Sequence, residues 1–323
     1  MLFGATCNKR IARRMRSYRK HRNLRYALHS EGSKQGQRMP ELPLAVWIAL
    51  AAVLGLLVGS FLNVVILRLP ERMAASWRRE AREVLELEAD DAPLPPGIVR
   101  EPSHCPHCKH PLSAADNIPL FGWLLLRGRC RYCEAKISIQ YPLVELFSGV
   151  LSALVVWKFG PSWAALAGLV FTWVLIAAAG IDFRTQLLPD QLTLPLLWLG
   201  MVLSLIPLFA SAPSAIIGAA IGYLSLWSVY WAFKLLTGKE GMGHGDFKLL
   251  AALGAWMGPV ALLPVILLSS LIGALVGGSL IALRKHQREI PMPFGPFIAA
   301  AGWVWFMAGP QLLQGYMHFT GLR

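Results

Sequence analysis

Three aspartates stand at the ends of apolar segments: Asp182, Asp190 and Asp246. Ionisable side chains are rare at the rim of membrane segments, and where they occur they are functional candidates by default. Two carboxylates held close together cannot both ionise, so one stays protonated as an acid while the other activates water as a base. Such a pair can hydrolyse a peptide bond without a metal or a covalent intermediate. The sequence leaves open which aspartate would be the acid.

A helix N-cap is the alternative role for an aspartate at the edge of a loop. We favour this role for Asp190, which follows Pro189 and precedes an apolar run. Asp182 ends its apolar run, where a carboxylate opposes the helix dipole, so capping explains it least. Asp246 follows GMGHG, and this glycine-rich context favours a catalytic role. We therefore predict Asp182 and Asp246 as the catalytic pair.

The residues around Asp246 are the expected supporting groups. Gly243 and Gly245 are expected to let the backbone bend at membrane depth and bring Asp246, or a substrate strand, close in. Lys248 and His244 lie near enough in sequence to tune the carboxylates, although snorkelling to the surface is the favoured role for Lys248.

Four cysteines form a second constellation, with the spacing C-x2-C-x21-C-x2-C: Cys105, Cys108, Cys130 and Cys133. Two such knuckles can surround a tetrahedral zinc ion, and four thiolates would make the site structural rather than catalytic. Two disulfides are the competing interpretation, which a reducing compartment disfavours. Three nearby histidines are alternative ligands, although solvated loop positions are the favoured interpretation: His104, His107 and His110.

Composition identifies the elements that must position these groups. Of the 323 residues, 55% are hydrophobic and 15% charged, against about a quarter charged in soluble proteins. We therefore expect an all-α polytopic membrane protein with about eight transmembrane helices and a small cytoplasmic zinc-ribbon-like domain between the first two. The expected spans are 43–67, 142–158, 162–181, 191–210, 213–235, 246–258, 260–283 and 295–316.

Charge predicts the orientation of these spans. Loops on one side are rich in Lys and Arg, whereas those on the other side contain only Lys158, so the first side is cytoplasmic. This side also carries the aspartates and the four paired cysteines. Residues 1–38 hold eleven Lys and Arg against one Glu, and translocating them would break the rule. We expect this segment to be an upstream extension or a processed piece, and assign Cys7 no role.

These expectations divide the chain into four parts. The first is a basic extension and the second the first transmembrane helix. The third is a cytoplasmic zinc-binding domain with four cysteine ligands, and the fourth a seven-helix membrane aspartyl peptidase domain. Their ranges are 1–38, 39–67, 68–140 and 141–323.

An ordered set of motifs resembles the bacterial type IV prepilin peptidases, which are GxGD intramembrane aspartyl proteases. The motifs are GSFLNVVILRLP at 59–70, the paired CxxC knuckles, NIPLFGWLLLRGRC at 117–130, YPLVELFSG at 141–149, DFRTQLLPDQLTLPLLWLG at 182–200, GMGHGDFKLLAALGAWMG at 241–258 and PFGPF at 293–297. The resemblance implies removal of the basic leader from type IV prepilins and type II secretion pseudopilins at the cytoplasmic face of the bacterial inner membrane. The implied catalytic residues are Asp182 and Asp246, not Asp190.

Members of this family also methylate the new N-terminus with S-adenosylmethionine, which the resemblance alone implies as a cofactor here. Gly128 and Arg129 of the RGRC loop are the positions we would assign to methyl transfer, although a turn supporting the second knuckle explains them equally well. Expected partners are prepilins, pseudopilins and the lipid bilayer, with no nucleic acid.

Two other protein classes compete with a peptidase. A proton-coupled transporter would also place carboxylates and broken helices along a pathway, but here the polar residues cluster at one face and no inverted repeat is visible. A membrane scaffold without chemistry would leave Asp182 and the glycines unexplained. Two roles remain secondary: Asn63 is expected to bridge helices, and PFGPF either pairs with extended substrate or begins a helix.

Overall fold

The structure is a computed structural model that describes residues 42–88, 92–99, 101–113, 115–283 and 292–321. The predicted basic extension, residues 1–38, lies outside the described residues. All elements below belong to the compact unit Leu44–Arg323.

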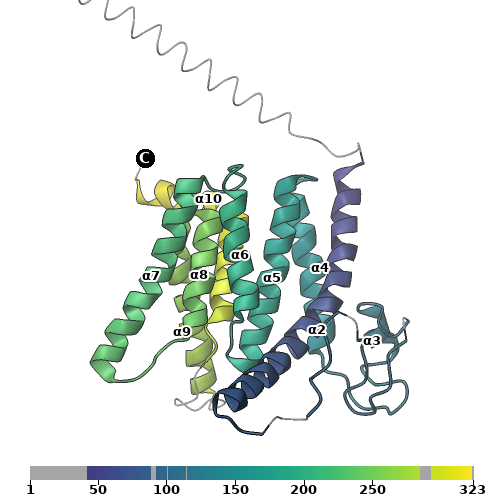
Figure 1. Cartoon of the computed structure of the whole chain (residues 1–323). Coiled ribbons are helices and arrows are strands. Elements are labelled where there is room, and N and C mark those ends of the chain that lie inside the picture. Colours follow the sequence, from purple (N-terminus) through teal and green to yellow (C-terminus); the bar gives the residue numbers. More distant parts are fainter. Residues whose placement is uncertain (1–41, 89–91, 100, 114, 284–291, 322–323) are drawn as a thin grey trace, which may run out of the picture. The chain divides into compact units, whose positions relative to one another are not determined.

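The described residues are helical, with two isolated β-bridges and no named strand (Figure 1). The helices are α2 (Leu44–Val84), α3 (Phe121–Leu125), α4 (Gln140–Phe159), α5 (Trp163–Thr185), α6 (Asp190–Leu203), α7 (Ala212–Thr237), α8 (His244–Met257), the 3-10 helix η2 (Pro259–Ala261), α9 (Leu262–Ala282) and α10 (Gly295–Thr320). Among them, α2, α4, α5, α7, the η2–α9 segment and α10 are long and apolar enough to cross a bilayer. The all-α, multi-pass prediction is confirmed, while the count of eight spans stays a prediction because α6 and α8 have only 14 residues each.

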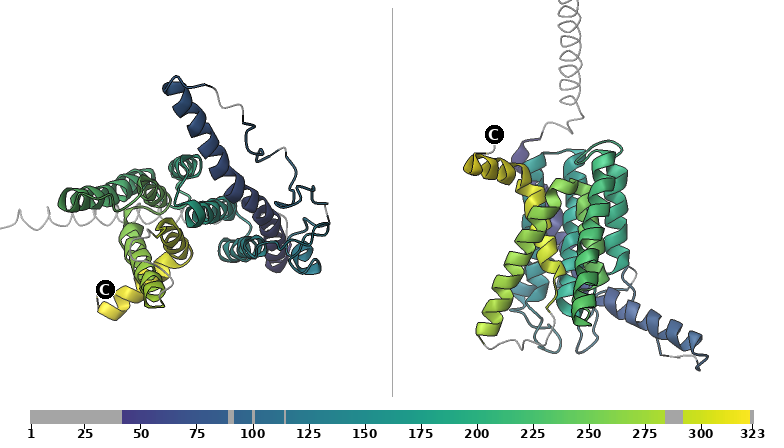
Figure 2. Two further views of the ribbon diagram at one scale, coloured as in Figure 1. Left: turned by 90° about the horizontal axis from the view of Figure 1, so that it is seen from below. Right: turned by 90° about the vertical axis from the view of Figure 1, so that its left-hand side faces the viewer.

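Helix α2 is much longer than the predicted first span. It runs for 41 residues, or about 60 Å at 1.5 Å per residue, twice the hydrocarbon thickness of a bilayer. The charged segment after residue 67 therefore continues the same helix, with Pro70 inside it, and extends beyond the other helices in Figure 2.

Several arginines on α2 hold the returning chain through its backbone carbonyls, and one of them is buried. Arg68 is buried on α2, and its guanidinium donates hydrogen bonds to three backbone carbonyl oxygens. These belong to Gly97, Glu101 and Pro102, at 2.6, 3.0 and 3.0 Å. Because a buried cation needs such partners, Arg68 fixes the start of the cysteine unit, which we define as residues 101–139, against α2.

Helix α8 is the buried centre of the second half of the chain. It packs against α6, α7 and α10, and ten of its 14 residues are buried, as expected for a helix that is apolar all round. Its crossing with α7 is close because Gly218 and Gly254 face each other, and a Cβ on either would collide with the backbone of the other. This packing fixes the start of α8, where Asp246 lies.

Helices α2 and α4 form a second close pair. A Cβ on Gly59 of α2 would lie 2.7 Å from the Cα of Glu145 on α4. The Asn63 side chain bridges the pair, as predicted, by donating to the Tyr141 carbonyl oxygen at 3.0 Å. The pair thus presents Asn63, Tyr141 and Glu145 toward the cysteine unit.

Candidate active site and cysteine centre

The structure brings Asp182 and Asp246 together from two helices. Asp182 lies in the last turn of α5 and Asp246 in the first turn of α8, with exposed fractions of 5% and 7%. They are close enough for the charge of Asp182 to act on Asp246. The first turn of a helix also favours a carboxylate through the helix dipole. Two nearly buried carboxylates within electrostatic range of each other are compatible with an aspartyl mechanism.

The two carboxylates differ in their hydrogen bonding. The backbone N–H of Gly295, at the start of α10, donates to Asp182 Oδ2 at 2.9 Å. Asp246 Oδ1 is buried and has no hydrogen-bond partner within the described part of the chain. A buried polar atom without a partner is unfavourable in a folded protein and is typical of groups kept for function. Asp182 is thus oriented by the protein, while Asp246 has one oxygen without a hydrogen-bond partner among the described residues.

Gly295 is a site residue that the sequence left unassigned. The PFGPF motif begins helix α10, which is one of the two roles expected for it. A Cβ on Gly295 would lie 2.7 Å from Asp182 Oδ2, closer than side-chain carbons approach such atoms. Only glycine therefore leaves room for the Asp182 carboxylate at this point.

The two glycines before Asp246 have structural roles that differ from the predicted backbone bend. Gly243 is the N-cap of α8, with φ of −79°, and a Cβ added there would meet nothing within 4 Å. Gly245 already belongs to the helix, and a Cβ on it would lie 2.5 Å from the Cβ of Leu188. Gly245 thus lets the turn before α6 approach α8, and a backbone bend at this residue is not observed.

Asp190 and Lys248 form an ion pair, which corrects the capping role predicted for Asp190. Pro189 occupies the N-cap of α6, so Asp190 begins the helix and makes no capping hydrogen bond. Lys248 Nζ instead contacts both oxygens of Asp190, at 2.6 and 2.7 Å. The pair is partly exposed and worth at most about 1 kcal/mol. It joins the first residue of α6 to the second turn of α8.

The four cysteines converge as predicted: Cys105, Cys108, Cys130 and Cys133. Their sulfur atoms all lie within 4.8 Å of one another, and two of the pairs, Cys105–Cys133 and Cys108–Cys130, are 3.8 and 3.9 Å apart. These separations are far above the length of a disulfide bond, about 2.05 Å. The cluster contains none of the three flanking histidines; His110 instead stacks on Tyr132, with ring centroids 3.7 Å apart.

The two knuckles repeat the same backbone geometry. In each, the N–H of the first cysteine donates to a carbonyl five residues later, and the residue four positions after that cysteine has a positive φ. Lys109 and Glu134 hold these positions, at 59° and 57°. The backbone N–H groups of Cys133 and Tyr132 lower the pKa of the Cys130 thiol to about 7, which favours its thiolate. This donor set fits a metal that prefers sulfur.

Gly128 and Arg129 lie at the base of the second knuckle. Gly128 has φ of 68°, and its carbonyl accepts a hydrogen bond from Ile137 as part of the knuckle. The indole of Trp123 lies against its Cα, since a Cβ there would be 2.8 Å from the ring. Arg129 forms a backbone bridge with Lys136. These contacts support the turn interpretation, and a role in methyl transfer stays a prediction.

Comparison with known proteins decides the family. Residues 53–159 match the bacterial peptidase A24 N-terminal domain, and residues 169–278 match the type IV leader peptidase family. A prepilin leader peptidase/N-methyltransferase from Xanthomonas campestris pv. campestris is 58% identical, over 84% of this chain and 95% of that protein. The chain belongs to the type IV leader peptidase family.

Other members of the type IV leader peptidase family are nearly as similar. Proteins with the same name from Stutzerimonas stutzeri and Pseudomonas aeruginosa are 54% and 51% identical, each over 87% of this chain and at least 96% of their own length. No solved structure matches significantly. Within the family match, both aspartates lie in the leader peptidase segment and the four cysteines in the N-terminal segment.

Proposed function

We propose that this chain removes the leader of prepilins with Asp182 and Asp246 as its catalytic pair and then methylates the new N-terminus. One observation carries the assignment of the pair: two nearly buried carboxylates from α5 and α8 interact, and Asp246 keeps an unpartnered oxygen. The curated relatives bear the name prepilin leader peptidase/N-methyltransferase. A transporter is not favoured, because the chain belongs to a peptidase family.

The chemistry follows from the pair. One carboxylate takes a proton from water as the water oxygen attacks the scissile carbonyl carbon, and the other, protonated, hydrogen-bonds the carbonyl oxygen. Collapse of the tetrahedral intermediate breaks the C–N bond, and a carboxyl group protonates the departing amine. The Gly295 N–H holds Asp182 in one orientation throughout, which lowers the entropic part of the barrier.

The predicted topology supports a cytoplasmic site in the bacterial inner membrane. The positive-inside rule, applied to the basic loops, supports a cytoplasmic position for the ends of α5 and α8 that carry the aspartates. We propose that the apolar helix of a prepilin or pseudopilin enters from the bilayer while its basic leader remains in the cytoplasm. The scissile bond at the end of the leader then lies at the level of the pair.

The cysteine cluster is proposed to hold structural zinc. With Zn–S bonds of about 2.3 Å, the sulfurs of a tetrahedral site lie about 3.8 Å apart. Two of the sulfur pairs, at 3.8 and 3.9 Å, match this edge, and all pairs lie within 4.8 Å. Cys105, Cys108, Cys130 and Cys133 would be the four ligands, and a zinc ion there would tie the two knuckles together.

Conservative substitutions test the catalytic pair. Wild type, Asp182→Asn, Asp246→Asn and Asp190→Asn are each co-expressed with a prepilin, and leader removal is read by mass spectrometry. Asparagine keeps the size of the side chain but cannot exchange protons. We expect the first two variants to leave the leader in place and Asp190→Asn to cut as wild type does. Leader removal by Asp182→Asn or Asp246→Asn would refute the proposal.

A further inference from the structure

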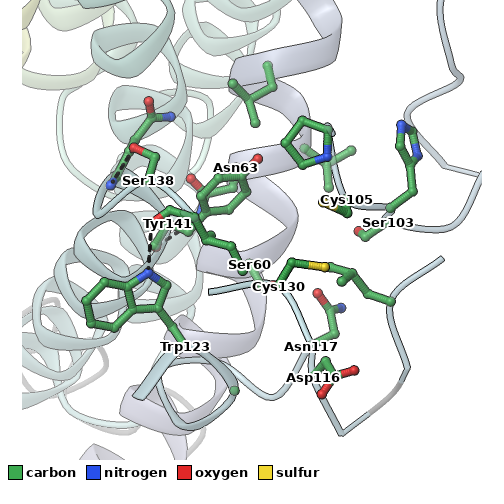
Figure 3. A pocket seen from close by; sticks show the side chains of 18 of the residues that line it. Ser60, Asn63, Ser103, Cys105, Asp116, Asn117, Trp123, Cys130, Ser138 and Tyr141 are labelled. Carbon is green, nitrogen blue, oxygen red and sulfur yellow. Dashed lines mark hydrogen bonds between the residues drawn. The ribbon is translucent and has the colours of Figure 1, made fainter. Parts of the chain in front are cut away.

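A cavity lies where the cysteine unit meets α2 and α4. Its volume is about 510 Å³, within the range of about 300–1,000 Å³ for small-molecule sites. Asn63 of α2 and Tyr141 and Glu145 of α4 line one side, and Trp123, Cys105 and Cys130 of the cysteine unit also line it. Figure 3 shows Tyr141 and Trp123 near Asn63, with the cysteines across the cavity. Nothing in the peptidase chemistry uses this space.

Unpartnered polar atoms mark the cavity as a binding site. The Asn63 side chain is only 1% exposed, and its Nδ2 is hydrogen-bonded while its Oδ1 has no partner among the described residues. Gln140, which also lines the cavity, accepts from Arg184 through Oε1 at 2.7 Å and leaves its buried Nε2 unpartnered. One open acceptor and one open donor suit a ligand whose edge carries both, such as an amino-substituted heterocycle.

The charges of the lining residues add a second requirement. Glu145 is 7% exposed, and its Oε2 accepts the Leu120 N–H at 2.8 Å, so its carboxylate is fixed beside the cavity. Three cations of the lining are already committed: Arg68 to three backbone carbonyls, Arg131 to Asp116 and Arg184 to Gln140. The two others, Lys109 and Lys136, are exposed to solvent, whereas Glu145 is buried. The carboxylate of Glu145 therefore favours a ligand with a buried positive charge.

An aromatic wall completes the site. The Trp123 Nε1 donates to the Ile137 carbonyl at 3.2 Å, and the ring rests against Gly128, so its position is fixed. Tyr141 lies on the α4 side of the same cavity. Planar rings bind flat heterocycles and attract cations through their π-faces.

We propose that this cavity binds the methyl donor, a sulfonium nucleoside such as S-adenosylmethionine. The inference rests on the proposed methyl transfer, and it assigns the place and the residues that recognise the donor. Asn63 and Gln140 meet the base or the amino-acid end through hydrogen bonds, Trp123 and Tyr141 contact the flat base, and Glu145 attracts the sulfonium. In the reaction the neutral α-amine attacks the methyl carbon, the C–S bond breaks with its electron pair going to sulfur, and the positive charge passes to nitrogen.

Binding measurements on the full chain in nanodiscs test the site without relying on activity. Calorimetric titration uses two probes, S-adenosylmethionine and its neutral thioether product S-adenosylhomocysteine. The test variant is Glu145→Gln, which keeps the acceptor for Leu120 but removes the charge; Glu83→Gln, exposed on α2, is the matched control. We expect Glu145→Gln to weaken the binding of S-adenosylmethionine about tenfold and that of S-adenosylhomocysteine much less. Only S-adenosylmethionine carries the positive charge on sulfur that the Glu145 carboxylate would attract. Glu83→Gln should change neither.

The proposal would be overturned if Glu145→Gln lost the same affinity for both probes or lost affinity for neither. It would also be overturned if the wild type bound neither probe. Because a variant can misfold, hydrogen exchange on the wild type gives an independent test. Binding of S-adenosylhomocysteine should slow amide exchange within residues 115–141 and leave exchange in α7 unchanged. If exchange slowed only outside residues 115–141, the proposed site would be wrong.

The two proposals fail in distinguishable ways. A chain that binds both probes here but does not methylate a cleaved prepilin would refute the proposed methyl transfer and keep the cavity. If the wild type methylates prepilin but Glu145→Gln binds both probes normally, the proposed binding site is refuted and the proposed methyl transfer stands.

Discussion

Replacing Gly295 with alanine should disturb the position of a catalytic carboxylate while leaving its chemistry intact. The added Cβ would lie 2.7 Å from Asp182 Oδ2 and 2.9 Å from Leu188 Cδ1. Both atoms are ends of side chains, so they can move and the helix itself can stay in place. Displacement of the Asp182 carboxylate is the change that should affect activity, because in the proposed mechanism this carboxylate acts together with Asp246.

The magnitude follows from the contact. Ordinary contact begins near 3.4 Å, so the Asp182 oxygen must retreat by about 0.7 Å from its present 2.7 Å. A misplacement of about 1 Å can slow an enzyme about 100-fold. We therefore expect Gly295→Ala to lower kcat between about tenfold and 100-fold. Stability should change by less than about 1 kcal/mol, because strain is offset by the lower chain entropy of alanine in the unfolded state.

The assay compares single-turnover cleavage of a purified prepilin by wild type, Gly295→Ala and Gly315→Ala in nanodiscs. Gly315 lies in the same helix, α10, and an added Cβ there meets nothing within 4 Å. Thermal unfolding of each variant checks stability. If Gly295→Ala cleaves as fast as Gly315→Ala, the start of α10 does not set the position of Asp182, and the reasoning is wrong.

Three further predictions follow from contacts elsewhere. Gly245→Ala should lower stability by about 1–3 kcal/mol through overpacking, whereas Gly243→Ala should be neutral, as thermal unfolding will show. Cys130→Ser should reduce bound zinc from one per chain, read by elemental mass spectrometry, and unchanged zinc would contradict the four-cysteine site. A hydrogen bond from Arg131 lowers the pKa of Asp116, so this pair stabilises above the ordinary carboxyl pKa and the effect is lost as pH falls through the lowered value. Unfolding midpoints of wild type and Asp116→Asn should therefore converge in acid, and a difference that persists there would exclude the pair as its cause.

Residue type and spacing were enough to predict the two constellations. Carboxylates at the ends of apolar runs and two C-x2-C knuckles are rare patterns with few physical explanations, and the structure brings each set together. Gly295 could not be found in this way, because its contact with Asp182 joins residues 113 positions apart and involves only a backbone N–H. Any residue but proline carries that donor, so the PFGPF motif that contains Gly295 does not by itself reveal this contact.

Local rules failed where two residues compete for one role. Asp190 was expected to cap α6, but Pro189 takes the cap position, and the carboxylate is free to meet Lys248. Hydropathy also gave no sign that the helix of the first predicted span, 43–67, continues to Val84. It reports where a helix would leave the lipid, and the charged segment after residue 67 contains good helix formers that continue α2 to Val84.

The end of α5 joins the two proposed reaction centres. Asp182 belongs to the peptidase pair, and Arg184, two residues later, lines the cavity and holds Gln140. A freshly released amine would need only to pass around one helix terminus to reach the methyl donor, without leaving the enzyme. Cleavage and methylation would then behave as a processive sequence, in which the unmethylated product does not accumulate even when competing prepilin is abundant.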